Sequence, residues 1–348
     1  ADDDSIIASV QSGGSLIVNG GSGNDLIQLD SVEGFVSMIA DSGSDSLIID
    51  KLESSGSVII DGGNGSMFIS IHSADGYFSI DGSPIGDDEL HIDSIGANAS
   101  INPINLGDGN DSIYISIASE SLEIDGDAGN DLISVNSATG DLSIDGGSGA
   151  DSIYNSSLNP GTTINAGLGN DSIQNYGASV SLYLEDGRNS VYNAGYYSTI
   201  EGGGSRDTID NGARYAILNG GSGRDSIQND ASYVTINGGE DNDTIRNSAY
   251  GYAAIINGGD DDDVIVNYGR YATIEGGAGN DIIDNLSLNA VIHGGSGADR
   301  IYNDTLVTNV EIFGDNGNDT LINWGSFVTM SGGAGDDYIY NRNNDSVS

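Results

Sequence analysis

The stretch NGGSGRDSIQN, residues 219–229, joins a glycine-rich turn to a short strand-like segment. Glycine reaches positive φ without steric cost, so the turn from Gly220 to Asp225 can bring several backbone carbonyls together beside the Asp225 carboxylate. A cluster of hard oxygen atoms is the ligand set of Ca²⁺, which takes roughly six to eight of them at about 2.3–2.6 Å. A single copy of this turn is also compatible with an aspartate that only caps backbone N–H groups.

The same turn recurs through the chain at a regular spacing. With Asp225 as the marker, equivalent positions follow one another in steps of 18 or 20 residues, apart from two steps of 23 between residues 65 and 111. Two of the seventeen copies lack the carboxylate, because they carry Gly65 and Asn189 at the marker position. The other fifteen copies carry the residues that we expect to bind metal, here called the marker aspartates: Asp25, Asp45, Asp88, Asp111, Asp131, Asp151, Asp171, Asp207, Asp225, Asp243, Asp263, Asp281, Asp299, Asp319 and Asp337. A repeat that covers almost the whole chain predicts one continuous solenoid over residues 1–348.

Each repeat contains two short segments with strand-like alternation. An apolar residue follows every marker by two positions, as Ile227 follows Asp225, and a second segment such as 233–236 precedes the next turn. Alternation of period two directs Val234 and Ile236 to one face of that segment. The pattern predicts an all-β fold, a parallel β-solenoid of about 17 coils of 18–20 residues with calcium turns along one edge. Because each coil has few core side chains to offset the cost of ordering its backbone, we expect bound cations to help hold the coils together.

The composition restricts the partners that the chain can have. It has 53 acidic and 9 basic residues, so its formal net charge is 9 − 53 = −44. Nucleic acid is excluded, because phosphate binding needs a basic surface, and no stretch has the apolar length needed for membrane insertion. Such a charge opposes compaction unless cations neutralise it. The chain has no cysteine, so metal is the expected substitute for disulfide bonds.

Several of the turns resemble a known nonapeptide. GGSGRDSIQ (220–228), GGAGNDIID (276–284), GGSGADSIY (146–154) and GGAGDDYIY (332–340) are similar to the Gly-Gly-x-Gly-x-Asp-x-aliphatic-x repeat of the RTX, or haemolysin-type calcium-binding, proteins. The resemblance implies a parallel β-roll that holds multiple Ca²⁺ ions in its turns. It also implies an extracellular protein of bacteria, either secreted or on the cell surface.

The chain departs from the pattern of that family in three ways. The motif occupies only one half of each coil, so we expect a single row of ions along one edge. The sites at Gly65 and Asn189 lack a carboxylate and are expected to be weak or empty. Ser205, Asp241 and Asp261 replace the third glycine, and we expect the aspartates to keep the turn because aspartate tolerates a left-handed backbone better than most residues.

The residue four positions after the marker changes in type near residue 150. It is apolar in residues 1–150 and asparagine in residues 151–341, from Asn155 to Asn341. Period-two alternation points this position inward, where stacked amides can hydrogen-bond to one another and to the turn backbone. We therefore expect an apolar ladder followed by an asparagine ladder. The alternative is an exposed row of asparagines that binds a ligand.

Tyrosines recur at one position of the later coils, namely Tyr197, Tyr215, Tyr233 and Tyr271. If they face outward, they form either a binding or lateral packing face or an ordinary strand surface. Nothing in the pattern of the chain predicts an enzyme, because the coils are short and the three histidines, His72, His91 and His293, are scattered without a recurring partner.

The expected function is structural: a calcium-dependent scaffold or stalk, or a subunit of a filament or surface layer. The array begins and ends without an evident cap, and repeat solenoids normally need caps, so we also expect head-to-tail assembly of the chain with itself. Two alternatives remain open. One is an adhesin or other repeat module that binds a glycan or ice, and the other is a noncatalytic module of a larger secreted toxin or enzyme.

Overall fold

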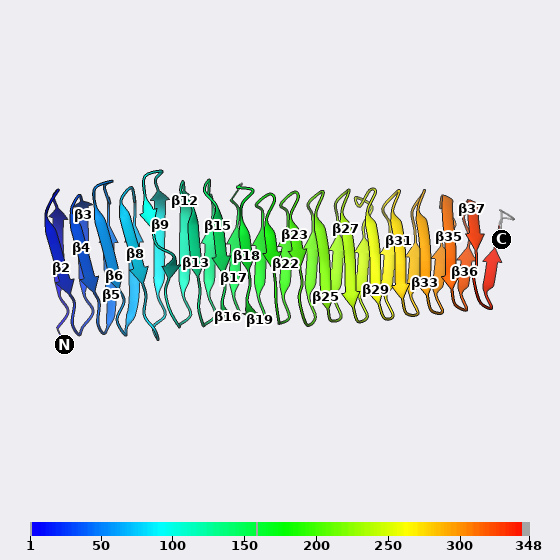
Figure 1. Ribbon diagram of the computed structural model, residues 1–348, viewed down its shortest axis with the longest axis horizontal. Coiled ribbons are helices and arrows are strands. Elements are labelled where there is room, and N and C mark those ends of the chain that lie inside the picture. The colour runs from blue at the N-terminus through cyan, green and yellow to red at the C-terminus, as the bar shows by residue number, and fades with distance from the viewer. Residues whose placement is uncertain (1, 158, 343–348) are drawn as a thin grey trace. The chain divides into compact units, whose positions relative to one another are not determined.

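A computed structural model describes residues 2–157 and 159–342. Every element assigned within these residues is a β-strand, and none of the described residues form a helix that could cross a membrane. The chain divides into two compact units, unit 1 (Ala1–Ser181) and unit 2 (Leu182–Ser348), and each is described by itself. Both are parallel β-solenoids with about one coil per sequence repeat, which confirms the predicted fold class (Figure 1). A single continuous solenoid over residues 1–348 stays a prediction.

The coils of unit 1 contribute their strands to two parallel sheets. The first sheet contains β1 (Ser5–Val10), β3 (Leu26–Val32), β5 (Ser44–Ile49), β7 (Ser66–Ile71), β9 (Glu89–Ile95), β12 (Ser112–Ala118), β14 (Leu132–Val135), β17 (Ser152–Asn155) and β20 (Ser172–Asn175). The second contains β2 (Ser15–Asn19), β4 (Phe35–Ile39), β6 (Ser57–Asp61), β8 (Tyr77–Asp81), β10 (Ser100–Ile101), β11 (Ile104–Asn105), β13 (Leu122–Asp125), β15 (Leu142–Asp145) and β18 (Thr163–Asn165). Two short strands, β16 (Ser148–Gly149) and β19 (Leu168–Gly169), pair between neighbouring turns.

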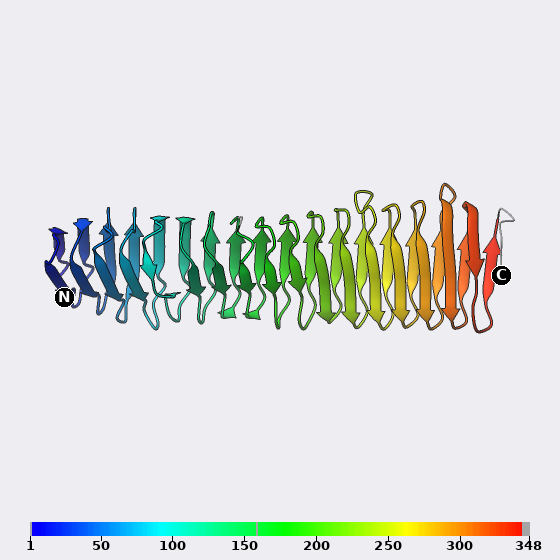
Figure 2. The ribbon, with the colours of Figure 1, turned by 45° about the horizontal axis from the view of Figure 1, so that its top comes forward.

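Unit 2 repeats this arrangement, and Figure 2 shows the two strands of each coil joined by turns. The strands that follow the markers are β22 (Ser190–Asn193), β24 (Thr208–Asn211), β26 (Ser226–Asn229), β28 (Thr244–Asn247), β30 (Val264–Asn267), β32 (Ile282–Asn285), β34 (Arg300–Asn303), β36 (Thr320–Asn323) and β38 (Tyr338–Asn341). The strands that precede the turns are β21 (Ser181–Tyr183), β23 (Thr199–Glu201), β25 (Ile217–Ser222), β27 (Thr235–Glu240), β29 (Ile255–Asp260), β31 (Thr273–Ala278), β33 (Val291–Ser296), β35 (Thr308–Asn316) and β37 (Ser326–Ser331). The first residue of β21 closes unit 1.

Strand pairing within each unit is in register from coil to coil. In unit 2, Ile227 pairs with Ile245 and Ile245 pairs with Ile265, and all three are buried. On the second sheet, Ile236 pairs with Ile256 in the same way. The core is therefore a stack of aliphatic side chains from successive strands.

Because the period of a strand is two, this register places most marker aspartates beside the marker of the neighbouring coil. The exception is the coil between Asp45 and Asp88, where Met67 pairs with Asp45 and its N–H donates to Asp88 Oδ1. The predicted marker position Gly65 is therefore wrong by two residues, because this coil and its neighbours differ in length from the regular repeat.

The asparagines of unit 2 form an interior ladder, as the structural interpretation of the sequence predicts. Asn229 is fully buried. Its Oδ1 accepts hydrogen bonds from Asn211 Nδ2 at 2.9 Å and from the Ala231 N–H at 3.2 Å. Its Nδ2 donates to the Ala231 carbonyl at 2.7 Å and to Asn247 Oδ1 at 2.8 Å. Every hydrogen-bonding position of the amide is thus used, within the coil and across to both neighbours.

Replacement of a ladder asparagine should therefore be costly. Asn229→Ala leaves four partner groups without their hydrogen bonds in a buried site, and we expect it to lower the free energy of unfolding by about 2–4 kcal/mol. Chemical denaturation in saturating calcium measures the change. Thr235→Ala, at an exposed strand position, is the control and should change stability by less than about 0.5 kcal/mol. An equal effect of both variants would contradict a structural role for the ladder.

Candidate calcium turns

The marker aspartates end the glycine-rich turns, and all except Asp337 are buried, with at most 3% of the residue exposed. The turn reaches positive φ twice, at 103° for Gly221 and 128° for Gly223. Where the third glycine is replaced, the backbone stays left-handed, with φ of 72° at Asp241 and 73° at Asp261. The prediction that aspartate can replace glycine here is confirmed.

One carboxylate oxygen of each marker aspartate is occupied by the protein itself. The Asp207 N–H donates to Asp225 Oδ1 at 2.7 Å, and the Asp225 N–H donates to Asp243 Oδ1 at 2.7 Å. The same contact links most neighbouring markers in both units, including Asp131 to Asp151 in unit 1 at 2.8 Å. It is interrupted after Asp45, where the Met67 N–H is the donor to Asp88 Oδ1. The aspartates therefore form a ladder in which each Oδ1 binds the backbone of the preceding coil. The sequence did not predict this contact.

The other carboxylate oxygen is buried and has no hydrogen-bond partner among the described residues in most of the marker aspartates. They include Asp25, Asp45, Asp111, Asp131, Asp151, Asp225, Asp243, Asp263, Asp281, Asp299 and Asp319. A buried carboxylate without compensation is strongly unfavourable, so such an oxygen requires either a proton or a cation.

The unpartnered oxygen lies close to backbone carbonyls. A Cβ atom added to Gly220 would clash with Asp225 Oδ2 and with the carbonyl oxygen of Gly238, the equivalent glycine of the next coil. Glycine is required at this position because carboxylate and carbonyl oxygens from two coils share the space that a side chain would fill. The described residues contain no group of three or more acidic, histidine or cysteine side chains that could hold a metal ion. Most ligands of an ion in this place would therefore be backbone carbonyls.

The Asn189 coil, one of the two repeats without a marker carboxylate, shows what the site needs. Asn189 occupies the marker position and is buried. Its Nδ2 donates to the carbonyls of Leu184 and Gly187 at 3.2 and 3.3 Å. In the Asp225 coil, the equivalent carbonyls belong to Gly220 and Gly223. A positively polarised amide thus fills the position in the Asn189 coil where the other coils place only oxygen atoms, and these atoms fit a hard cation such as Ca²⁺.

Burial also raises the pKa values of the marker carboxyls, because desolvation disfavours the charged form. The pKa rises to about 8 for Asp243, to about 7 for Asp111, Asp151 and Asp263, and to about 6 for Asp88, Asp131, Asp281 and Asp299. The backbone N–H bond to Oδ1 opposes this rise, whereas neighbouring carboxylates add to it at several of these positions. Without a cation, part of the ladder would therefore hold protons near neutral pH.

Two marker aspartates differ from the others. Asp88 Oδ2 accepts a hydrogen bond from the Ser83 N–H at 2.8 Å, so the protein already satisfies this oxygen. Asp337 is only half-buried. Ser83 lies in the region of the 23-residue steps, which displaces the turn relative to its neighbours. The sequence predicts Asp88 as a metal ligand, and its hydrogen bond makes it the least suited of the buried markers to hold one.

Exchange of aspartate and asparagine at the marker position should change the number of bound calcium ions and leave the fold intact. Asp225→Asn keeps an acceptor for the Asp207 N–H and supplies the donor that Asn189 has. We expect it to lower the calcium count by one and to stabilise the calcium-free protein, while Asn189→Asp raises the count by one. Metal analysis of calcium-saturated protein and thermal melts without calcium measure both changes. An unchanged count in both variants would contradict the assignment of the marker positions.

Comparison with known protein families agrees with this geometry. Residues 219–249, 273–286, 288–306, 309–324 and 328–345 match the model of the RTX calcium-binding nonapeptide repeat (4 copies). No curated protein sequence matches the chain. The matched segments belong to unit 2. They contain six marker aspartates together with the turn that precedes each: Asp225, Asp243, Asp281, Asp299, Asp319 and Asp337. The chain therefore carries RTX calcium-binding nonapeptide repeats, and the ions that these repeats bind are multiple Ca²⁺ ions.

Proposed function

We propose that the protein is a calcium-dependent structural β-solenoid that works outside the cell. In this proposal, the fifteen marker aspartates and the nearby turn carbonyls are the calcium ligands. The observation that carries it is the column of buried Oδ2 atoms without partners. One ion for each marker aspartate would change the formal net charge from −44 to −44 + 30 = −14. Calcium would thus remove most of the self-repulsion that opposes folding.

The calcium requirement supports a place outside the cell. A chain that needs calcium to neutralise its turns would stay unfolded where free calcium is scarce and would fold where it is abundant. Extracellular calcium modules bind with dissociation constants of about 10⁻⁴–10⁻³ M. We expect the midpoint of calcium-induced folding in this range, measured by circular dichroism of calcium-free protein at pH 8. A midpoint below about 10⁻⁶ M, in the range of intracellular calcium sensors and buffers, would contradict the extracellular role.

A scaffold fits the remaining surface better than an enzyme does. Each histidine lies beside a single carboxylate: His72 near Asp50, His91 near Glu89 and His293 near Asp315. His91 also stacks on Tyr114, with ring centroids 4.6 Å apart. Contacts of this kind are ordinary surface packing. We therefore propose that the chain has no catalytic role, and assay against polysaccharide substrates tests this.

Ice binding is less well supported than a scaffold function. Ice-binding solenoids need a flat, regular row of one residue type, and the strand register of unit 2 places Thr199, Ile217, Thr235, Ile255 and Thr273 in one column. Every second member is an isoleucine, so the row is not uniform. Thermal hysteresis in calcium-loaded protein would reverse this ranking. End-to-end assembly, a glycan ligand and membership of a larger secreted protein stay predictions of the sequence.

A further inference from the structure

Five tyrosines of unit 2 form one continuous column of ring contacts. The ring centroids of Tyr197 and Tyr215 are 4.9 Å apart, and those of Tyr215 and Tyr233 are 5.3 Å apart. In each pair the two ring planes are inclined to each other by only 6°. The column continues from Tyr233 to Tyr252 at 5.6 Å and from Tyr252 to Tyr271 at 5.1 Å. Each coil of this region thus contributes one ring to the same line, here called the tyrosine column.

The backbone beneath the column is strained. Tyr197, Tyr215, Tyr233 and Tyr271 have φ between 60° and 62°, in the left-handed region that disfavours bulky side chains. The equivalent position holds Asn289 in the coil after Tyr271, with φ of 60°. Asparagine tolerates this conformation better than tyrosine. The fold therefore needs a left-handed residue here but does not need a tyrosine, and repeated strain of this kind indicates a functional surface.

The column persists where the coil length changes. The coil between Asp243 and Asp263 has 20 residues, and its left-handed residue is Ala253, with φ of 53°. This position carries no tyrosine, but the adjacent Tyr252 supplies the ring that contacts both Tyr233 and Tyr271. Successive coils therefore all place a tyrosine ring in the column, although the backbone position that carries the ring differs in the coil of Ala253.

The column is exposed and uncharged on a strongly acidic chain. Its five side chains belong to residues that are 40–61% exposed. Arg214 and Arg270 directly precede Tyr215 and Tyr271, and both are exposed. Among the described residues, neither arginine forms an ion pair. Tyrosine and arginine are the residue types enriched at the energetic centres of protein interfaces.

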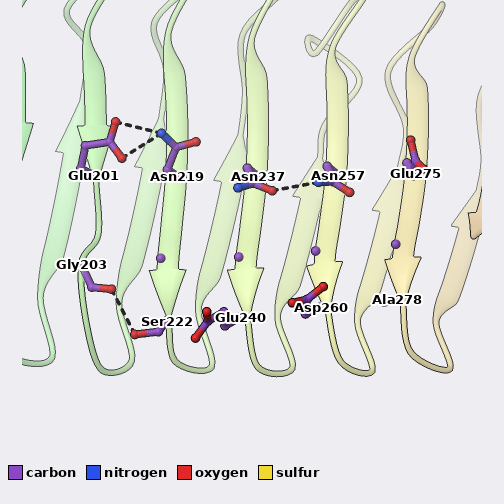
Figure 3. Close-up of a pocket in the computed structure, with 14 residues that line it drawn as sticks. Glu201, Gly203, Asn219, Ser222, Asn237, Glu240, Asn257, Asp260, Glu275 and Ala278 are labelled. Atoms are coloured by element: carbon purple, nitrogen blue, oxygen red, sulfur yellow. Dashed lines mark hydrogen bonds between the residues drawn. The ribbon is translucent and has the colours of Figure 1, made fainter. Parts of the chain in front are cut away.

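A nearby surface of unit 2 has the opposite character. A groove of about 940 Å³ crosses the strands β23 to β31, and Figure 3 shows the side chains that line it. Its walls include Glu201, Glu240, Asp260 and Glu275 and no basic residue. Two copies of the chain would repel each other at this groove. The tyrosine column is therefore the better place for close approach of a second acidic molecule.

We propose that the tyrosine column is a lateral docking surface for a second copy of this chain. Mutual stacking leaves ring edges and hydroxyls exposed along most of the column, which suits a protein partner better than a sugar ring that needs a free aromatic face. A second copy presents rings at the same coil spacing, so the contacts match over all five coils. Its arginines can also pack on the partner's tyrosines, as Arg246 packs over Tyr268 within the chain, 5.0 Å from the ring centroid.

The expected assembly is a closed, symmetric dimer in which the same surface of both copies is buried. This inference does not depend on the marker aspartates as calcium ligands. If the marker aspartates are not calcium ligands, the protein would keep its β-structure when it is free of metal. Failure of the tyrosine column would appear as monomers that retain their fold.

The test compares two sets of substitutions in calcium-saturated protein. The column variant replaces four strained tyrosines: Tyr197→Asn, Tyr215→Asn, Tyr233→Asn and Tyr271→Asn. The control variant replaces four exposed tyrosines outside the column: Tyr183→Asn, Tyr192→Asn, Tyr338→Asn and Tyr340→Asn. Sedimentation velocity over a range of protein concentration gives the association constant, and thermal melts report the fold.

We expect the native chain and the control variant to dimerise, and the column variant to associate more weakly by about tenfold or more. The column variant should melt at the same temperature as the native chain or higher, because asparagine relieves the strain. A native chain that stays monomeric at every concentration would overturn the proposal. Equal association of the column variant and the native chain, or equal loss of association in both variants, would also overturn it.

Discussion

Removal of calcium at pH 8 is expected to unfold the protein almost completely. At this pH most marker aspartates are ionised, since the highest pKa value among them is about 8, at Asp243. Each then holds a buried negative charge on an oxygen that has no donor among the described residues. An uncompensated buried charge costs several kcal/mol, and the cost recurs in most coils. The sum exceeds the usual stability of a domain, which is about 5–15 kcal/mol.

Far-ultraviolet circular dichroism before and after chelation measures the effect. We expect the β signal to disappear with chelator and to return with excess calcium. Magnesium is the control, because it requires near-ideal octahedral geometry and keeps several of its waters, so it should restore the signal poorly. Full retention of the β signal in protein shown to be free of metal would contradict the calcium requirement.

Acidification is expected to rescue the calcium-free fold. The marker carboxyls of the folded chain have pKa values raised by burial, to about 6 at Asp131, about 7 at Asp263 and about 8 at Asp243. The pKa of an aspartate in the unfolded chain is about 3.9. Between these values, the folded state holds more protons than the unfolded state, so the stability of the calcium-free protein falls as pH rises. The protein without calcium should therefore be folded near pH 5 and unfolded near pH 8.

Thermal melts of calcium-stripped protein at several pH values measure this dependence. In saturating calcium, the melting temperature should depend less on pH, because bound ions take the place of protons at the marker carboxylates. Salt is the control: at about 1 M ionic strength the Debye length is about 3 Å, so salt screens the repulsion between surface carboxylates but not the buried charges. Refolding at pH 8 by sodium chloride alone would show that surface repulsion, and not the buried ladder, causes the instability.

Much of the fold could be predicted from the spacing of one residue type. Because strands pair in register from coil to coil, the regular steps between markers predict which residues are neighbours, and the pairing of Ile227 with Ile245 follows directly. The prediction is wrong where the coil length changes, since Asp45 pairs with Met67 and not with Gly65. The left-handed turns at Asp241 and Asp261 also follow, since aspartate accepts that backbone conformation. The inward position of Asn229 follows from strand alternation.

Other features depend on contacts that no local pattern reports. The hydrogen bond from the Asp207 N–H to Asp225 Oδ1 joins residues 18 positions apart. Only the stacked geometry shows that Asp225 Oδ2 is then left without a hydrogen-bond partner. Ser83 takes the second oxygen of Asp88 because a longer coil displaces the turn. Tyr252 joins the tyrosine column although its sequence position is shifted by an insertion. In each case a change in coil length or a contact between coils decides the outcome.

The position of the ions tests the account most directly. A crystal of calcium-loaded protein, measured for the anomalous scattering of calcium, would locate each ion without reference to a model of the turns. We predict an ion within about 2.3–2.6 Å of Asp225 Oδ2 and no ion beside Asn189. Well-ordered density at the Asp225 turn in saturating calcium, with no anomalous peak there, would contradict the claim that the buried Oδ2 atoms are calcium ligands.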